Sequence, residues 1–334
     1  MNSICLTVMI ILGFMFGSPI FAADKAEEIL KAVVKIQTQI PDDAATASLL
    51  GTEREGNGVL IDSDGHILTI GYIILDAERI DVISSENDVI EAAFVGYDYD
   101  TGFGLLRAKK PINAIPMALG RSSELKEGDP VLVAGHGGSE AVIGARVITI
   151  GEFTGYWEYL IDKAIFTTPP YANYGGAVLI APDGTILGIG SIFTQVAVRG
   201  FGVVQSNMFV PIDLLKPILS DLKTIGRSGQ SQKPWLGVHT EESHGRVFVI
   251  RIMRGGPAEK ADLQIGDLIL KVNGQAVNGQ ADFYRKVWAL GTAGVKVPIS
   301  ILRGTEIQEF NLQSADRYQF FKRPTQNAPK KDNL

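Results

Sequence analysis

The sequence predicts a mainly β fold in two parts, a large barrel or sandwich followed by a smaller α+β unit. Between residues 34 and 211, short runs rich in Val, Ile and Leu alternate with Gly-containing turns, as is typical of all-β barrels and sandwiches. Asp-Gly pairs at 64–65 and 183–184 each separate two apolar runs, and such pairs are strong hairpin signals. The later part combines short strands with a helical period over 281–290, which indicates the α+β unit.

The N-terminus predicts export. An uncharged apolar run at 4–16 is followed by the helix breakers Gly17 and Pro19 and by the small residue Ala22, the layout of a secretory signal. The run is shorter than the roughly 20 residues of a membrane-spanning helix. We expect cleavage after Ala22 and a periplasmic or secreted protein without a membrane span; retention as an anchor is the alternative. Cys5 is the only cysteine, so the mature chain would have no disulfide.

The composition limits the classes of function. Hydrophobic residues make up 46% of the chain, enough for a core without disulfides. The net charge of −6 gives no electrostatic reason to expect nucleic acid or anionic lipid as a partner. We expect neither a cofactor nor a metal site.

Composition also divides the chain along its length. An amphipathic helix is expected over 24–34, where apolar side chains recur on one side. A polar Gly- and Ser-containing stretch marks a flexible linker, and the last residues, poor in apolar side chains, are expected to be disordered. The predicted boundaries are a signal peptide at 1–22, a β domain at 23–222, a linker at 223–233, a second domain at 234–316 and a tail at 317–334.

The β domain resembles the protease domain of the HtrA/Deg family. Residues 58–69, Gly-Val-Leu-Ile-Asp-Ser-Asp-Gly-His-Ile-Leu-Thr, are similar to the opening hairpin of that family. Val-Gly-Tyr-Asp at 95–98, Lys-Glu-Gly-Asp-Pro-Val at 126–131 and Phe-Val-Pro-Ile at 209–212 follow in the family order. The resemblance covers roughly residues 30–222 and implies a chymotrypsin-like double β-barrel.

The second domain resembles the PDZ domain of the same family. Residues 255–274 follow its pattern, with a Gly-Pro turn, a short helix, a Gly-Asp pair before a buried strand and a closing Asn-Gly turn. Strands are expected at 247–252, 268–272 and 296–302, and a helix at 281–290. The resemblance implies binding of peptide or protein C-termini.

The three positions of the catalytic triad are replaced. A serine protease needs a hydroxyl nucleophile, an imidazole base and a carboxylate that orients the imidazole. By resemblance, Tyr72 occupies the position of the His, Gly102 that of the Asp and Tyr174 that of the Ser. We expect the two tyrosines to fill the former cleft, and a phenol with a pKa near 10 is a poor nucleophile without a base.

The former oxyanion region, Ala172, Asn173 and Gly175, departs from the family pattern as well. Ala172 replaces the first Gly of the motif, and the loop before it is about two residues shorter than the family loop. His136, in a Gly-rich turn, is interpreted as a loop residue rather than a substitute base. The remaining histidines are expected to lie away from the triad positions, so loss of hydrolysis is expected.

The PDZ groove is predicted from the segment Pro-Trp-Leu-Gly-Val at 234–238. Gly237 allows close backbone approach to a ligand, and the strand from Val238 would pair with the peptide. Phe283 and Val287, one turn apart on the helix, would line the pocket for the last side chain, or would be core residues only. The predicted peptide-binding residues are Lys233, Trp235, Leu236, Gly237, Val238, Phe283 and Val287.

Together these features predict a proteolytically inactive envelope protein that binds peptide C-termini or unfolded proteins, as a regulator, scaffold or chaperone-like binder. The alternative is an active serine endopeptidase of periplasmic protein quality control, which fold resemblance alone implies. The resemblance also implies a homo-oligomer, a trimer, or association with a catalytically active relative.

Overall fold

The computed structural model describes residues 27–198, 200 and 202–320. The predicted signal peptide, with its cleavage site after Ala22, lies outside the described residues, as does the tail beyond residue 320. No helix in the described part of the chain is long and apolar enough to span a membrane.

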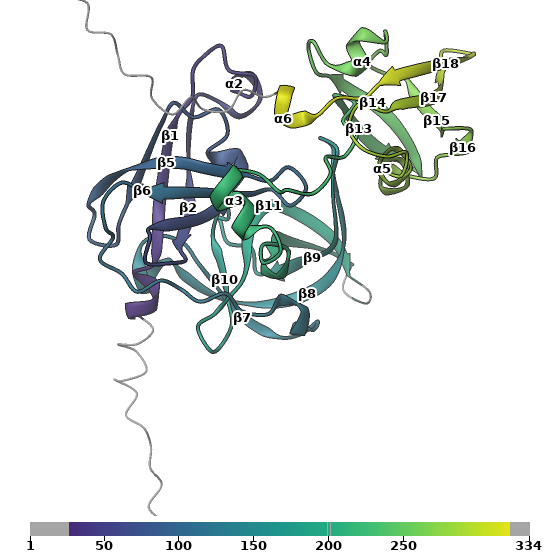
Figure 1. Cartoon of the computed structure of the whole chain (residues 1–334). Helices are drawn as coiled ribbons and strands as arrows, with labels where there is room; N and C mark the ends of the chain where they lie inside the picture. The colour runs from purple at the N-terminus through teal and green to yellow at the C-terminus, as the bar shows by residue number, and fades with distance from the viewer. Residues whose placement is uncertain (1–26, 199, 201, 321–334) are drawn as a thin grey trace, which may run out of the picture.

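Two closed six-stranded antiparallel barrels form the first domain, so the predicted all-β fold is confirmed (Figure 1). The first barrel has the strand order β1-β2-β3-β6-β5-β4 and the second β10-β11-β12-β9-β8-β7. The strands are β1 (Val33–Gln39), β2 (Glu53–Leu60), β3 (His66–Ile70), β4 (Arg79–Ile83), β5 (Val89–Tyr97), β6 (Phe103–Ala108), β7 (Pro130–Ala134), β8 (Val142–Gly155), β9 (Tyr159–Thr168), β10 (Val178–Ile180), β11 (Ile186–Val198) and β12 (Gly202–Pro211).

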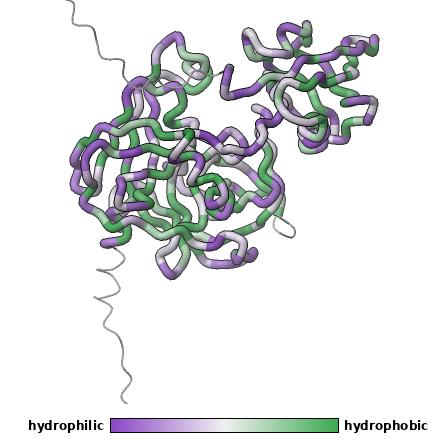
Figure 2. Tube along the Cα trace, viewed as in Figure 1, coloured by the Kyte–Doolittle hydropathy of each residue, from purple (hydrophilic) through white to green (hydrophobic). Residues whose placement is uncertain are grey.

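Both Asp-Gly turns form as the sequence predicts. Val59 of β2 pairs with Leu68 of β3 across the first turn, and β10 pairs with β11 across the second. Gly65 and Gly184 have φ angles of 83° and 87°, which glycine adopts without a steric penalty. The buried core is continuous across the two barrels, and Figure 2 shows hydrophobic residues along the barrel strands.

The helix predicted over 24–34 is wrong in its second half. The described chain is helical at 27–30, and Val33 and Val34 already belong to β1. They lie opposite Val59 and Gly58 of β2. Closure of the barrel on a pair of β-branched residues overrides the helical period that the sequence suggests.

The second domain is a small sheet with two helices. Its strand order is β13-β14-β15-β17-β18, with β16 beside β15, so β13 is an edge strand. The strands are β13 (Val238–Ser243), β14 (Arg246–Ile252), β15 (Leu268–Val272), β16 (Gln275–Ala276), β17 (Lys296–Arg303) and β18 (Glu306–Gln313). The helices are α4 (Pro257–Lys260) and α5 (Gln280–Trp288), and elsewhere α2 (Ala47–Leu50), α3 (Leu219–Ile225) and α6 (Arg317–Phe320).

The predicted linker is anchored at both of its ends. Residues 223–225 belong to α3, and Gly226, at φ 73°, is its C-cap. The carbonyl oxygen of Gly226 accepts the Tyr97 N–H at 3.2 Å, and that of Gln232 accepts the Ala293 N–H at 2.7 Å. The segment therefore contacts the first barrel near its start and the PDZ unit near its end.

The tail predicted to start at 317 is also wrong for its first four residues, which form α6. The Tyr318 hydroxyl lies 3.1 Å from the Tyr97 carbonyl oxygen and accepts the Tyr99 N–H at 3.2 Å. The Tyr318 ring packs edge-on against Tyr99, and the Arg317 guanidinium lies 4.6 Å from the centre of the Tyr99 ring. These contacts give the segment a binding surface on the first barrel that its composition does not reveal.

Candidate functional site

Tyr72 and Tyr174 meet at the cleft between the two barrels. Tyr72 lies in the 3-10 turn η1 (Gly71–Ile73) directly after β3, and Tyr174 lies in the loop before β10. Both rings line a cavity of about 450 Å³, together with His136. The Tyr72 hydroxyl donates a hydrogen bond to the carbonyl oxygen of Ser191 at 2.9 Å. Burial raises the pKa of Tyr72, so this phenol stays neutral and serves as a packing group.

Gly102, at the third triad position, closes a tight turn. Its φ is 82°, its N–H donates to the carbonyl oxygen of Asp98 at 2.8 Å, and its own carbonyl accepts the Gly71 N–H at 2.8 Å. A Cβ at this position would lie 3.3 Å from the Tyr159 hydroxyl. The turn therefore favours glycine, and the backbone of any residue with a side chain would be strained here.

Asn57 of β2 is a structural residue that sequence reasoning missed. Its side-chain amide donates to the carbonyl oxygens of Asn173 at 2.7 Å and Gly175 at 3.1 Å, and its Oδ1 accepts the His136 N–H at 2.8 Å. The side chain thereby ties the former oxyanion loop to the His136 turn. Asn57 is buried, and the only mark of it in the sequence is its place between two glycines, Gly56 and Gly58.

The loop at 172–175, the predicted oxyanion region, lies close to the Tyr72 side chain. Ala172 and Asn173 are exposed, and a Cβ on Gly175 would lie 2.8 Å from the Tyr72 hydroxyl. The Gly175 carbonyl oxygen also accepts the backbone N–H of Asn57 at 2.8 Å. The phenol at the His position and the backbone of this loop are thus in close contact.

His136 lines the same cavity, but its ring is turned to another partner. Its Nε2 lies 2.9 Å from the carbonyl oxygen of Ser84, and a carbonyl can only accept. Nε2 is therefore the protonated nitrogen and is occupied by Ser84. This geometry agrees with a loop histidine.

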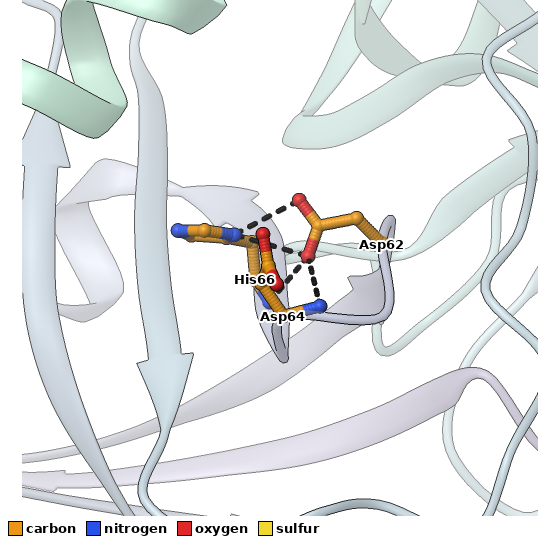
Figure 3. A group of neighbouring side chains, drawn as sticks. All are labelled: Asp62, Asp64 and His66. Carbon is orange, nitrogen blue, oxygen red and sulfur yellow. Dashed lines mark hydrogen bonds and ion pairs between the residues drawn. The ribbon is translucent and has the colours of Figure 1, made fainter.

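His66 lies at the opposite end of β3 from Tyr72, in a polar group with Asp62 and Asp64 (Figure 3). The Asp62 carboxylate lies 2.9 Å from His66 Nδ1 and 2.6 Å from Lys223 Nζ, and it accepts the backbone N–H groups of Asp64 and His66. Burial raises the pKa of Asp62, but the hydrogen bonds from Lys223 and His66 hold it below its usual value. The Lys223 ammonium already balances the carboxylate charge, so the group stabilises a turn.

The structure brings His239 closer to the cleft than its place in the second domain suggests. It lines a cavity of about 510 Å³ whose wall also includes Tyr72 and Tyr174. Its ring packs against Tyr156 at 5.2 Å between centroids. Burial and the neighbouring Arg251 lower the pKa of His239 to about 4, so it is neutral at pH 7.

In the PDZ domain, three backbone N–H groups converge on one carboxylate. Leu236 N–H donates to Oε2 of Glu158 at 2.9 Å, and Gly237 and Val238 donate to its Oε1 at 2.8 and 3.1 Å. Glu158 lies in the turn between β8 and β9 of the second barrel. Sequence reasoning identified the three donors but missed this acceptor, because donor and acceptor are 78 to 80 residues apart in the chain.

Two further predicted peptide-binding residues, Lys233 and Trp235, have side chains in different surroundings. Lys233 Nζ lies 3.3 Å from Asp100 Oδ1 and 4.2 Å from the centre of the Trp288 ring. Trp235 is buried in the cluster that includes Tyr97 and Tyr99. Lys233 and Trp235 therefore contact neighbouring side chains, and both precede the three N–H groups in the chain.

Phe283 and Val287 are fully buried in the PDZ core, in one cluster with Leu160 of β9. Helix α5, which carries both residues, packs against β9. Leu160 of the first domain thus packs in the PDZ core together with Phe283 and Val287.

Comparison with known proteins finds a separate match for each of the two domains. A family model for the trypsin-like peptidase domain matches residues 56–189, and one for the PDZ domain matches residues 234–313. A probable periplasmic serine endoprotease, DegP-like, from Pseudomonas putida (strain W619) is 30% identical over 275 residues, which cover 77% of this chain and 55% of that protein. A protein of the same description from Pseudomonas fluorescens is 31% identical over 264 residues, 74% of this chain and 53% of that one. The chain spans about half the length of these relatives.

Solved structures with a similar fold include the HtrA-type protease AlgW. With a tripeptide it matches at a TM-score of 0.52 and 22% identity, covering 88% of this chain and 96% of that chain. With a decapeptide it matches at a TM-score of 0.53 and 20% identity, covering 88% and 98%. At this identity the likeness shows a shared fold. With its trypsin-like peptidase domain followed by a PDZ domain, the chain belongs to the HtrA/DegP family.

Proposed function

We propose that this chain is a proteolytically inactive HtrA-type protein of the cell envelope that binds peptide C-termini through its PDZ domain, as a regulator, scaffold or chaperone-like binder. The observation that carries the first half is the set of residues at the triad positions, Tyr72, Gly102 and Tyr174. None of the three side-chain types performs the role that its position serves in a serine protease.

The geometry around the cleft supports this half. Among the described residues that line the two cavities, no serine or threonine hydroxyl is hydrogen-bonded to a histidine. His136 donates from Nε2 to Ser84, and the Tyr72 hydroxyl donates to Ser191. A hydroxyl without an adjacent base is a weak nucleophile at neutral pH.

The binding half rests on the loop Leu236–Val238. Its three N–H groups already hold a carboxylate in this structure, and β13 is an edge strand to which an extended peptide can be added. These are the two features that PDZ-type recognition of a chain terminus requires. The envelope location is proposed from the predicted signal peptide and from the relatives named as periplasmic.

An active endopeptidase is the competing function, because the relatives are named endoproteases. A fluorophosphonate probe, with casein degradation as a second assay, distinguishes the two. We expect neither labelling nor cleavage by the purified mature chain. Labelling that disappears in a single Ser→Ala variant, with Ser191 the first to be tested because it lies at the cleft, would overturn the inactive assignment.

The binding half is tested with the wild-type protein and Gly237→Glu. Gly237 has a φ of 73°, and a Cβ there would lie 3.2 Å from the Trp235 ring, so this substitution distorts the loop and adds a negative charge to it. We expect titration with a library of free-carboxylate decapeptides to give binding that Gly237→Glu abolishes. Binding that is the same in both proteins would place the site elsewhere. Light scattering of the same samples gives the oligomeric state.

A further inference from the structure

We propose that the PDZ groove is occupied by an internal ligand, the Gly155–Glu158 turn of the β8–β9 hairpin, and that a peptide C-terminus binds by displacing Glu158. This inference rests on the proposed peptide-binding function of the groove. Figure 1 shows that the β8–β9 hairpin belongs to the second barrel, whereas β13 belongs to the PDZ sheet.

The carboxylate of Glu158 is held as a terminal carboxylate would be. Both of its oxygens accept backbone N–H groups of Leu236, Gly237 and Val238 at 2.8 to 3.1 Å. Glu158 is 6% exposed, and a buried carboxylate is tolerated only where donors compensate for the lost water. The charge of Arg317 in α6 also favours its ionised form. The donors that a peptide needs are therefore already in use.

The backbone of the turn follows the edge strand as well. Thr240 N–H of β13 donates to the carbonyl oxygen of Tyr156 at 2.9 Å, two residues before Glu158. On α5, the Tyr284 hydroxyl donates to the Gly155 carbonyl oxygen at 2.8 Å and lies 3.3 Å from the Glu158 N–H. A carboxylate at the loop and a main-chain bond further along the strand are the two components of peptide binding by strand addition.

The backbone conformation of Glu158 points to a role for its side chain. Its φ is 56°, in the left-handed region, at the last position of a three-residue hairpin loop. Glycine is the residue that this position favours, and a non-glycine residue costs of order 1 kcal/mol or more there. The turn itself gives no reason for a glutamate, whereas the three hydrogen bonds to the PDZ loop require its carboxylate.

Displacement of Glu158 would also reach the cleft between the barrels. Tyr156 and Trp157 of the same turn line the 510 Å³ cavity together with Tyr72 and Tyr174. A peptide that replaces the turn therefore removes part of the wall of this cavity. Binding at the PDZ loop and the shape of the degenerate cleft are coupled through one hairpin.

Glu158→Gly is the decisive variant, because it removes the carboxylate and gives the turn the residue that its φ favours. Glu158→Gln keeps the length of the side chain and serves if the glycine variant folds poorly. Glu140→Gln is the matched control, since Glu140 is exposed in η3 (Gly138–Ala141), outside the groove. Hydrogen exchange of the backbone amides at 236–238 and titration with free-carboxylate and amidated decapeptides are measured on the full mature chain.

In Glu158→Gly we expect faster exchange of these amides and at least about tenfold tighter peptide binding, because an internal ligand competes at a high effective concentration. The control should match the wild type, and the amidated peptides should bind poorly. Unchanged exchange in both Glu158 variants overturns the internal ligand. Faster exchange with unchanged peptide affinity overturns the competition but leaves the peptide-binding function standing. Faster exchange without binding of any peptide overturns both the peptide-binding function and the displacement.

Discussion

Gly102, the residue predicted at the position of the triad Asp, connects the proposed inactivity to the backbone at the level of one residue. Its left-handed backbone and its two hydrogen bonds, to Asp98 and Gly71, fix a turn in which a carboxylate-bearing residue is strained. If the chain is inactive as proposed, exchange of side chains alone should therefore not restore a triad.

We expect Gly102→Asp to destabilise the protein by about 1–3 kcal/mol. The aspartate must adopt a positive φ, and its Cβ lies close to the Tyr159 hydroxyl. The triple variant with Tyr72→His, Gly102→Asp and Tyr174→Ser should fold less stably and cleave no casein. Urea unfolding measures the loss of stability. Gly144→Asp is the control, since Gly144 is exposed on β8 with no atom within 4 Å of an added Cβ. Equal losses from the two single substitutions would refute the argument from backbone strain.

Glu158 is the second residue whose environment leads to a measurable prediction. Burial raises its pKa from 4.5 to about 7, against the opposing effect of the three N–H donors and Arg317. A carboxyl whose pKa is higher in the folded state contributes stability that is fully present below pH 4.5 and is lost as the pH rises through about 7. Near it lie Lys233, Asp100 and Tyr284, and the pKa of Tyr284 is raised by burial, so that group stays neutral.

We therefore expect the difference in unfolding free energy between wild type and Glu158→Gln to change by up to about 3 kcal/mol between pH 4.5 and 8, with the wild type losing stability relative to the variant. Urea unfolding at several pH values measures it. His239, with a pKa of about 4, titrates in both proteins and cancels in the comparison. Parallel stability curves would show that Glu158 does not change its protonation in this range.

At the level of elements, the short helix α6 packs against the first barrel and is hydrogen-bonded to it. Its Tyr318 hydroxyl lies 3.3 Å from Oδ1 of Asp98. Burial raises the pKa of Asp98, and hydrogen bonds from Thr101 and Tyr318 partly oppose this rise. Loss of this hydroxyl leaves the buried carboxylate and the Tyr99 N–H with one partner fewer.

We expect Tyr318→Phe to reduce stability by about 1–2 kcal/mol, because the Asp98 carboxylate and the Tyr99 N–H each lose one hydrogen bond. It should also raise the pKa of Asp98 further. Thermal unfolding at pH 7 measures the first effect. Tyr156→Phe is the control, because Tyr156 is 42% exposed. A loss in the control as large as in Tyr318→Phe would argue against the specific role of this hydroxyl.

The elements themselves were largely predictable where local chemistry decides them. The Asp-Gly turns at 64–65 and 183–184, the strand at 268–272 and a helix near 281–290 follow from turn residues and apolar periodicity. The helix over 24–34 and the start of the tail at 317 failed, since partners far away in the chain decide those segments: β2 in the first case and the loop around Tyr99 in the second. A local pattern carries no record of such partners.

At the scale of the whole molecule, the candidate site is assembled from two domains. The N–H groups at 236–238 and the residues predicted to replace the triad could be named from the sequence, because each lies inside a recognisable motif. Glu158 was not found, since its significance appears only when β8 and β9 extend to the PDZ sheet. The remaining clue is a glutamate where a tight hairpin favours glycine.

Among the contacts that join the hairpin to the PDZ domain, an exposed group of ion pairs and the buried Glu158 carboxylate should respond differently to salt. Arg285 of α5 pairs with Glu152, at 2.7 Å, and with Asp162, in a group that is largely solvent-exposed. Glu158, by contrast, is buried and bound by main-chain donors. Exposed ion pairs contribute about 0–1 kcal/mol and are screened by salt, whereas buried contacts are screened much less.

We therefore expect Arg285→Ala, or an increase in salt from about 0.05 to 0.5 M, to change amide exchange at 236–238 little. Glu158→Gly should accelerate that exchange strongly under both salt conditions. If Arg285→Ala or high salt releases these amides as fully as Glu158→Gly does, the surface ion pairs hold the domains together and Glu158 follows passively. If they stay protected, one buried carboxylate controls access to the groove, and the molecule opens for partners whose own carboxylate can replace it.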